Sequence, residues 1–404
     1  METLKFVIVG HVDHGKSTLI GRLLYDTNSL PEGKLDELKA VCDGLGRPLE
    51  FGFVMDGLEE ERNQGVTIDT TQIWFRTKQR EYNIIDAPGH VEFIKNMVTG
   101  ASQAEAAILI VDAKEGVQEQ TRRHAYVLGM LGLKQVIVVI NKMDLVGFSR
   151  ERYEKVAFEL NSFLARLHIT PNYVIPISAM EGDNIVNPSG SMLWYTGPTV
   201  LKALASFKPH PSNDKKPLRF SVQDVYRHDK RIVVGMVNSG ILRKGQQVVV
   251  MPSGETTVIE SIEEFLKENI EMAPTGSATG IVTKDKLFIE RGDVLCGPEN
   301  LPKITDEFKA HIFWMSKEPL KNKERIILKL STQQAIAEVE LMKVIDSSTL
   351  EEMGSAIELK NRQVAYVVIR PDKPMVVESF NNIEELGRFV LERMNTCAGG
   401  IITK

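Results

Sequence analysis

Eight residues near the N-terminus have the types and the order needed to bind phosphate groups. They are Gly10-His11-Val12-Asp13-His14-Gly15-Lys16-Ser17, and Thr18 follows them. The two glycines allow the backbone to curl so that its N–H groups point toward phosphate oxygens. The amine of Lys16 can reach the β- and γ-phosphates of a nucleotide, and the hydroxyl of Ser17 can bind Mg²⁺. This order of residues predicts a phosphate-binding loop.

A second motif, Asp86-Ala87-Pro88-Gly89-His90, follows the apolar stretch Tyr82–Ile85. An aspartate at the end of a strand can hold Mg²⁺, usually through water. The N–H of Gly89 can meet a γ-phosphate. We therefore predict that Asp86 and the four residues after it contribute to the same nucleotide site.

Two further motifs follow apolar strands and have the groups needed to recognise guanine. They are Asn141-Lys142-Met143-Asp144 and Ser178-Ala179-Met180. The carboxylate of Asp144 can accept hydrogen bonds from the ring N–H and the exocyclic amine of guanine, a pair that adenine lacks. We expect Asn141 and Lys142 to brace the loop and cover the base. The second motif would supply backbone donors to the base oxygen.

Thr67 lies in a polar segment, Asn63–Asp69, that follows a long, charged and loop-like stretch, Ser29–Arg62. A threonine hydroxyl that binds Mg²⁺ only when a γ-phosphate is present makes a switch, because hydrolysis then releases the loop. The spacing of Ser17, Thr67 and Asp86 favours this interpretation. The sequence predicts these three residues as metal ligands.

Short apolar strands alternate with helical patterns as far as residue 207, and most of the motifs follow the strands. The strand candidates are Phe6–Val9, Tyr82–Ile85, Ala107–Val111, Val136–Ile140 and Tyr173–Ile177. The helical patterns are Val91–Met97, Gln118–Leu131, Ser149–Leu167 and Pro198–Phe207. This alternation predicts a doubly wound, mostly parallel sheet, whose ligands bind beyond the carboxyl ends of the strands.

The pattern changes at Lys208–Pro217, where three prolines and a polar cluster indicate a linker. Short alternating strands separated by turn residues follow, which is typical of antiparallel β-barrels. A second β region begins near Ile304. We predict an α/β domain over residues 1–208, a linker over 209–217, and antiparallel β-barrels over 218–300 and 301–404.

The composition limits the classes of protein to which this chain can belong. Of 404 residues, 43% are hydrophobic and 25% are charged, as in soluble globular proteins, and the length predicts two or three domains. The net charge of −5 gives no sign of a protein that binds polyanions through bulk charge. The three cysteines are far apart, which argues against a disulfide framework and favours a cytoplasmic location. No apolar run approaches the ~20 residues that span a bilayer, so no membrane association is expected.

The motifs Gly10–Ser17, Asp86–His90 and Asn141–Asp144 together resemble the translational GTPase superfamily, of elongation factor Tu type. The resemblance covers the whole chain. It implies an α/β P-loop GTPase domain with a doubly wound, mostly parallel sheet, followed by two antiparallel β-barrel domains. It also implies GTP and GDP as ligands and Mg²⁺ as the metal.

The resemblance also implies catalytic roles. By similarity, His90 occupies the position that orients the attacking water, with Val12 and Val66 beside it as an apolar gate. Lys16, Thr67 and Mg²⁺ would offset the charge that develops on the phosphates. The remaining histidines show no ligand spacing and are expected in surface or packing roles: His124, His168, His210, His228 and His311.

Two branches of the superfamily compete. One is elongation factor 1-alpha, which delivers aminoacyl-tRNA to the ribosome. The other is the GTPase subunit of bacterial sulfate adenylyltransferase, which couples GTP hydrolysis to the formation of adenylyl sulfate and pyrophosphate from ATP and sulfate. That second reaction takes place on a separate catalytic subunit. A third class, a regulatory switch that binds RNA or ribosomes, also stays open.

Several stretches resemble the sulfate-activating branch more. They are Ala101–Ala104, Gln120–His124, Met251–Gly254, Ile289–Leu295 and Phe313–Leu320. The last barrel also lacks the strand bearing Cys and His with which elongation factors open it, and Lys309–Trp314 stands there instead. His11 and His14 favour the elongation factors, because the sulfate branch more often shows Ser and Asp at these positions. The segment Lys373–Phe380 also resembles an elongation factor.

The sulfate-activating branch leads. It implies a heteromer in which a separate sulfate adenylyltransferase catalytic subunit carries the ATP site, because the one nucleotide site of this chain is accounted for by guanine recognition. It implies no nucleic-acid partner. The alternative is a translational GTPase of elongation factor 1-alpha or Tu type, which would bind aminoacyl-tRNA.

Overall fold

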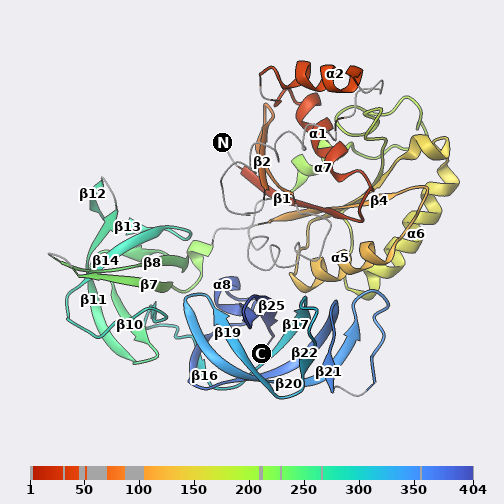
Figure 1. Ribbon diagram of the computed structural model, residues 1–404. Coiled ribbons are helices and arrows are strands. Elements are labelled where there is room, and N and C mark those ends of the chain that lie inside the picture. The colour runs from red at the N-terminus through yellow and green to blue at the C-terminus, as the bar shows by residue number, and fades with distance from the viewer. Residues whose placement is uncertain are drawn as a thin grey trace. The chain divides into compact units, whose positions relative to one another are not determined.

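The computed structural model describes residues 3–30, 32–44, 51, 71–86, 104–208, 213–227, 230–264, 267–354 and 357–403. The chain divides into two compact units. The first covers Met1–His210 with Ser347–Thr349, and the second covers Pro211–Asp346 with Leu350–Lys404. Figure 1 shows that helices accompany the strands of the first unit, whereas the second unit is built mainly of strands.

The first unit is organised around a six-stranded sheet with the order β2-β3-β1-β4-β5-β6. Its strands are β1 (Thr3–Gly10), β2 (Thr71–Arg76), β3 (Glu81–Asp86), β4 (Ala106–Asp112), β5 (Val136–Asn141) and β6 (Tyr173–Pro176). All neighbours are parallel except β2, which runs antiparallel to β3. Every residue of β4 is buried, which explains its continuous apolar sequence.

Helices lie on both faces of this sheet (Figure 1). They are α1 (Lys16–Asp26), α2 (Lys34–Gly44), α5 (Glu119–Met130), α6 (Arg150–Arg166) and α7 (Val200–Ser206), and the short helix η2 (Met143–Val146) follows β5. Leu19 and Leu23 of α1, Leu204 of α7, and Phe6 and Ile8 of β1 share one hydrophobic core. The other face carries α5 and α6, so the sheet is doubly wound as predicted.

Helix α2 corrects one prediction, because it lies within the charged stretch Ser29–Arg62 that reads as a loop in the sequence. Its first turn carries Asp36 and Glu37, and acidic residues there interact favourably with the helix dipole. The charges that suggested a loop therefore suit a helix. Strand β2 was not predicted either, and the predicted helix Val91–Met97 lies outside the described residues.

The second unit begins with the short helix η3 (Asn213–Lys215) and an antiparallel ring of strands. The ring order is β10-β15-β7-β8-β14-β11, with β12 beside β11, and the pairing of β10 with β11 closes it. The strands are β7 (Arg219–Arg227), β8 (Arg231–Ser239), β10 (Gln247–Met251), β11 (Glu255–Glu264), β12 (Lys267–Ile270), β14 (Ala278–Thr283) and β15 (Val294–Cys296). β9 (Leu242–Arg243) pairs with β13 (Met272–Ala273).

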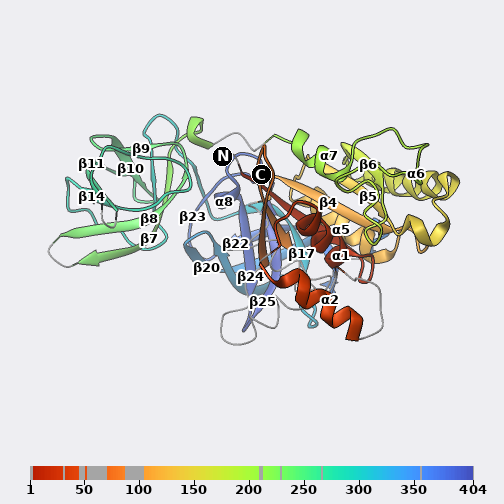
Figure 2. The same cartoon turned by 90° about the horizontal axis from the view of Figure 1, so that it is seen from above.

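Six of the remaining strands form a closed barrel in the order β17-β22-β20-β19-β24-β25 (Figures 1 and 2). They are β17 (Phe308–Trp314), β19 (Glu324–Leu330), β20 (Gln333–Asp346), β22 (Gln363–Pro371), β24 (Arg388–Glu392) and β25 (Thr396–Ile402). Two short strand pairs and one short helix accompany it: β16 (Lys303–Thr305) with β23 (Met375–Val377), β18 (Leu320–Lys321) with β21 (Glu358–Leu359), and α8 (Glu384–Gly387).

Within the second unit, the two rings of strands are joined by the buried side chain of Arg219. Its guanidinium donates to the Glu378 carboxylate at 2.7 and 3.0 Å. It also donates to the backbone and side-chain oxygens of Asn300, both at 2.9 Å. Arg219 is 0% exposed, and its charge is offset by this carboxylate and by the oxygens around it.

The predicted fold class, a doubly wound, mostly parallel sheet followed by two antiparallel barrels, is confirmed. The predicted boundaries at residues 208, 217 and 300 stay predictions. No helix among the described residues is long and apolar enough to cross a bilayer.

Candidate nucleotide-binding site

The predicted phosphate-binding loop connects β1 to α1, because β1 ends at Gly10 and α1 begins at Lys16. Both of its glycines are required by close approach. A Cβ atom on Gly10 would lie 2.5 Å from the carbonyl oxygen of Ile110 on β4. Gly15 has a φ of +93°, where side chains are strained, and a Cβ there would lie 2.3 Å from Nδ2 of Asn141. The loop therefore packs tightly against its neighbours.

The amine of Lys16 lies over this loop. Nζ donates to the carbonyl oxygens of Gly10 and His11, at 3.0 Å each. Burial lowers the pKa of Lys16, whereas the negative charges of Asp86 and Asp13 raise it. The ammonium group is thus held by weak acceptors inside a partly buried loop, which is an arrangement suited to an anionic ligand.

The other residues of the loop differ in exposure. Val12, Asp13 and Ser17 are exposed, and Thr18 is half-buried on α1. Asp13 has a φ of +62°, in the left-handed region. Ser17 therefore lies exposed in the first turn of α1, and its hydroxyl is an oxygen donor of the kind that Mg²⁺ binds.

Asp86 ends β3 and lies beside β1, where its register partner is Ile8. Its charge acts on Lys16, so the structure brings the first two predicted motifs together. The other predicted residues near this point, Ala87, Pro88, Gly89 and His90, lie outside the described residues, as do Thr67 and Val66.

Asn141 joins the phosphate-binding loop to the two base-recognition motifs. It ends β5 and is buried. Its Nδ2 donates to the carbonyl oxygen of His14 at 2.9 Å, and its Oδ1 accepts from the backbone N–H of Ala179 at 3.0 Å. A single amide therefore fixes the distance between three loops.

Asp144 and Ser178 form the second contact between the base-recognition motifs. Oδ1 of Asp144 accepts a hydrogen bond from the Ser178 hydroxyl at 2.6 Å. Ser178 is fully buried, while Asp144 is half-buried, so the carboxylate keeps an open side. Met143 is buried, and its N–H donates to the carbonyl oxygen of Ile177 at 3.1 Å. Met180 is exposed, and its carbonyl oxygen accepts from Arg22 at 3.3 Å.

Lys142 has a φ of +60° and pairs with Asp112 at the end of β4, with 2.8 Å between Nζ and Oδ2. Asp112 is buried, and its Oδ1 also accepts from the N–H groups of Lys114 and Glu115 at 2.6 and 3.2 Å. These bonds lower the pKa of Asp112 against the opposing effect of burial, which is the larger single influence. Sequence reasoning missed this partner of Lys142, although Asp112 directly follows the predicted strand Ala107–Val111.

Two histidines of the loop, His11 and His14, lie near His124 of α5, which sequence reasoning did not predict. The rings of His11 and His14 are 5.0 Å apart. His124 on α5 is buried, and burial lowers its pKa to about 3, with further lowering by the positive charge of Lys16 and by the other two rings. The expected packing role of His124 agrees with this burial. Its place beside the phosphate-binding loop could not be read from spacing.

The described residues contain no group of three or more His, Cys, Asp or Glu side chains that could hold a metal ion. A Mg²⁺ ion beside nucleotide phosphates needs few protein ligands. The exposed hydroxyl of Ser17 and the half-buried carboxylate of Asp86 are oxygen donors of the right kind for it.

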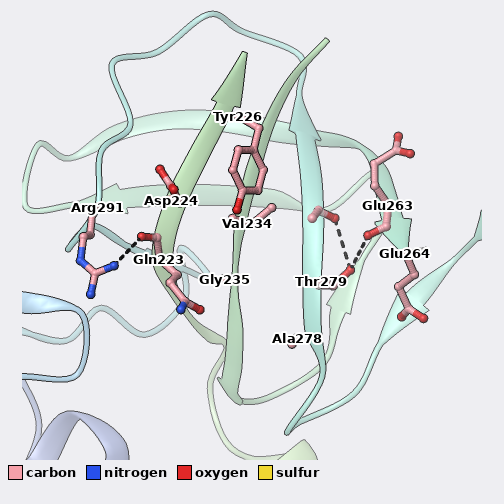
Figure 3. Close-up of a pocket in the computed structure, with 11 residues that line it drawn as sticks. Gln223, Asp224, Tyr226, Val234, Gly235, Glu263, Glu264, Ala278, Thr279 and Arg291 are labelled. Carbon is pink, nitrogen blue, oxygen red and sulfur yellow. Dashed lines mark hydrogen bonds between the residues drawn. The ribbon is translucent and has the colours of Figure 1, made fainter. Parts of the chain in front are cut away.

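A separate groove of about 610 Å³ opens on the first ring of the second unit (Figure 3). Its lining is Gln223, Asp224, Tyr226, Val234, Gly235, Glu263, Glu264, Ala278, Thr279, Gly280 and Arg291. The ladder between β7 and β8 is irregular between Val222 and Asp224, which leaves the backbone oxygen of Gln223 to accept from Arg291 at 3.1 Å. With three carboxylates and one guanidinium, this groove suits a ligand group with positive charge.

The sequence matches two protein-family models. Residues 1–274 match the model described as elongation factor Tu GTP binding domain. Residues 307–403 match the model described as GTP-eEF1A C-terminal domain-like.

Relatives from two functional groups are similar to this chain to nearly the same degree. Sulfate adenylyltransferase subunit 1 of Aeromonas hydrophila is 38% identical over 394 residues, which is 96% of this chain and 82% of that protein. Elongation factor 1-alpha of Methanocaldococcus jannaschii is 41% identical over 417 residues, which is 98% of this chain and 96% of that protein. Sulfate adenylyltransferase subunit 1 of Bacteroides fragilis is 37% identical over 99% of this chain and 86% of that protein.

The family model covers more than half of the chain, and it includes the loop at Gly10–Ser17 and the motifs at Asn141–Asp144 and Ser178–Met180. The resemblance seen in the sequence is thereby confirmed. The chain belongs to the elongation factor Tu-type family of GTP-binding proteins.

Proposed function

We propose that this chain binds GTP and hydrolyses it to GDP and phosphate. The loop from Gly10 to Thr18 would hold the phosphates, with Lys16 as their main positive charge. The single observation that carries this proposal is the position of the Lys16 amine, 3.0 Å from two carbonyl oxygens of the loop. Phosphate oxygens are stronger acceptors than these carbonyls, so the amine has a reason to turn to a nucleotide.

We propose that Asp144 selects guanine and that Asn141, Lys142 and Met143 shape its loop. The carboxylate would accept from the ring N–H and the exocyclic amine of the base. Ser178, Ala179 and Met180 would supply backbone N–H groups to the base oxygen. The hydrogen bond between Asp144 and Ser178 supports this scheme, because it orients the carboxylate while leaving acceptor positions for the base.

A Mg²⁺ ion would be held by Ser17, Thr67 and Asp86, and it would neutralise charge on the phosphates. Asp86 to Gly89 would approach the γ-phosphate through the backbone. His90 would orient the attacking water, and Thr67 and Lys16 would complete the catalytic set.

The wider role we propose is that of the GTPase subunit of a sulfate adenylyltransferase. GTP hydrolysis here would drive formation of adenylyl sulfate from ATP and sulfate on a separate subunit that carries the ATP site. Coupling of this kind requires that the GTP and GDP states differ in their affinity for states of the partner. The relatives named sulfate adenylyltransferase subunit 1 support this role, since they align over 96% and 99% of this chain.

The stretch Phe313–Leu320, which resembles the sulfate-activating branch, supports the same role from within the chain. Trp314 is fully buried, and its indole N–H donates to the carbonyl oxygen of Glu318 at 2.8 Å. The stretch thus begins at the end of β17 in the closed barrel and runs to β18. Its likeness to that branch extends to β17, the first strand of this barrel along the chain, which contains Lys309–Trp314.

The test is an assay of adenylyl sulfate formation. The tagged chain is purified with its partner from cells that express both, and ATP and sulfate are supplied with GTP, with GDP or with a GTP analogue that resists hydrolysis. We expect that GTP raises the yield of adenylyl sulfate, whereas GDP and the analogue do not. We also expect that GTP hydrolysis rises when ATP and sulfate are both present. GTP hydrolysis that ignores ATP and sulfate would overturn the wider role but leave the GTPase activity standing.

The second candidate is delivery of aminoacyl-tRNA, in the manner of elongation factor 1-alpha. His11 and His14 favour it, as does the 41% identity to the Methanocaldococcus jannaschii protein. This function predicts that the chain with GTP slows spontaneous hydrolysis of the aminoacyl ester of a charged tRNA, and that it does so less with GDP. Such protection, with no response to sulfate, would move the chain to translation.

A further inference from the structure

The side chain of His14 is enclosed at the start of the phosphate-binding loop. It is 0% exposed. Its Nε2 lies 3.2 Å from Oε2 of Glu115, which accepts but cannot donate when ionised. Its Nδ1 lies 3.3 Å from the backbone nitrogen of Asp112 and 3.5 Å from the carbonyl oxygen of Ile110. Both edges of the ring are therefore in use.

These partners select one form of the imidazole. The Glu115 carboxylate needs a proton on Nε2, and the N–H of Asp112, the nearer neighbour of Nδ1, needs a lone pair there. The neutral ring protonated on Nε2 satisfies both. A second proton on Nδ1 would face the Asp112 N–H and could meet only the more distant oxygen of Ile110.

The residues that His14 contacts lead to the base-recognition loop by two routes. Asp112 pairs with Lys142 at 2.8 Å, so the backbone that donates to the ring also positions the carboxylate that holds Lys142. The carbonyl oxygen of His14 accepts from Asn141 at 2.9 Å. The main chain of His14 thus contacts Asn141 directly, and its side chain is linked to the neighbouring Lys142 through Asp112.

We propose that His14 is a positioning residue that couples the phosphate-binding loop to the guanine-recognition loop through Asp112 and Asn141, with Glu115 fixing the ring. The inference rests on the proposed guanine-nucleotide site and adds to it the role of an enclosed side chain that touches neither phosphate nor base. Loss of the ring should weaken base selectivity as well as affinity, because Lys142 and its loop lose a fixed distance to the phosphates.

The groups around His14 set the choice of variants. His11 faces the ring from the same loop, Asp112 from the end of β4, Glu115 from the segment after β4, and His124 from α5. An asparagine at position 14 places an amide oxygen near the position of Nδ1, where it can accept from Asp112. A glutamine places an amide N–H near the position of Nε2, where it can donate to Glu115. The two substitutions therefore separate the two sides of the ring.

The experiment measures dissociation constants of GDP and of inosine diphosphate, which lacks the exocyclic amine, by titration of the full chain. For His14→Ala, GDP affinity should fall about tenfold, in keeping with one lost hydrogen bond in a buried network. The ratio of GDP to inosine diphosphate affinity should fall at least about threefold, because a displaced base loop reads the amine less well. His14→Asn should restore most of that ratio, and His14→Gln should not. His168→Gln, at an exposed histidine, is the matched control.

An unchanged ratio in His14→Ala, or equal ratios in the Asn and Gln variants, would show a merely structural role and overturn the inference. Failure of the unaltered chain to prefer GDP over inosine diphosphate would instead overturn the proposed guanine site. A double variant, His14→Ala with Glu115→Gln, completes the test. It should lose no more affinity than His14→Ala alone, since Glu115 acts through the ring.

Discussion

The Asp144 carboxylate accepts a hydrogen bond of 2.6 Å from the Ser178 hydroxyl, although the two residues belong to loops after different strands. Ser178 is fully buried, and its oxygen also accepts from the N–H of Glu181 at 3.2 Å. The hydroxyl is therefore fixed on both sides. It limits the carboxylate to one orientation, in which the remaining acceptor positions can face a ligand.

The substitution Asp144→Asn tests the proposed reading of guanine. It replaces one acceptor by an N–H donor that opposes the exocyclic amine, so GDP affinity should fall about 100-fold through loss of a charge-assisted hydrogen bond. Xanthosine diphosphate, which carries an oxygen at that position, should gain affinity over GDP in this variant. Titration with both nucleotides checks the prediction. Ser178→Ala, which leaves the carboxylate in place, should cost less, and an equal loss of both nucleotides in Asp144→Asn would contradict the assignment.

The substitution Asn141→Ala tests the amide that connects the loops. It leaves the carbonyl of His14 and the N–H of Ala179 without their partner, so nucleotide affinity should fall by about tenfold or more and the free energy of unfolding by about 1–3 kcal/mol. Nucleotide titration and urea unfolding give the two quantities. Asn172→Ala removes a comparable bond, 2.9 Å from its Oδ1 to the N–H of Val136 at the other end of β5. That control should lose some stability and no nucleotide affinity.

The burial of His124 allows us to predict how the free energy of unfolding depends on pH. Its pKa is lowered from 6.5 to about 3 in the folded chain, so below pH 6.5 the unfolded chain takes up a proton that the folded chain does not. The contribution of His124 to the free energy of unfolding is therefore complete above pH 6.5. It falls as the pH drops toward 3, by up to about 1.4 kcal/mol per pH unit for this one group.

Replacement of His124 by Gln should flatten that dependence. Between pH 7.5 and pH 5 the variant should lose about 2 kcal/mol less than the unaltered chain, whatever its stability at neutral pH. Urea unfolding at the two pH values measures the difference. His168→Gln removes an exposed histidine and should leave the slope unchanged. Equal slopes for all three chains would show that His124 carries a proton in the folded state.

We expect that removal of the buried guanidinium of Arg219 strongly destabilises the second unit. Arg219→Met leaves the Glu378 carboxylate and the oxygens of Asn300 without a buried donor, so the free energy of unfolding should fall by about 3–5 kcal/mol. Urea unfolding followed by Trp314 fluorescence reports on this unit when Trp74 and Trp194 are replaced by Phe. Lys244→Ala breaks an exposed pair with Glu271 in the same unit and should cost less than about 1 kcal/mol.

Much of the fold of the first unit could be predicted because its inner strands β4 and β5 are apolar over almost their full length. The predicted strand Val136–Ile140 lies within β5 (Val136–Asn141), and Gln118–Leu131 contains α5 (Glu119–Met130). The strand β2 was missed because it lies at the edge of the sheet, where Ile73 and Phe75 are buried but Trp74 is half exposed. Alternation over so few residues is a weak signal.

The site could be predicted as a set of motifs but not as a network. Order and spacing indicated that Lys16, Asp86 and Asp144 follow the ends of strands, and parallel strands bring such ends to one edge. The contacts that fix these loops join residues such as His14 and Glu115, which are 101 positions apart. Such pairs depend on tertiary packing, which one sequence does not encode in any local pattern.

The way the strands of the second unit close has a consequence for aggregation. Each of its two large ladders returns to its first strand, so the main strands there pair on both sides. In the sheet of the first unit, among the described strands, β2 and β6 each pair on one side only. Unpaired backbone groups on an outer strand are a template for strands of other molecules. Chains that associate under heat or mild denaturant should therefore do so through the first unit, at β2 or β6, while both barrels still resist intermolecular pairing.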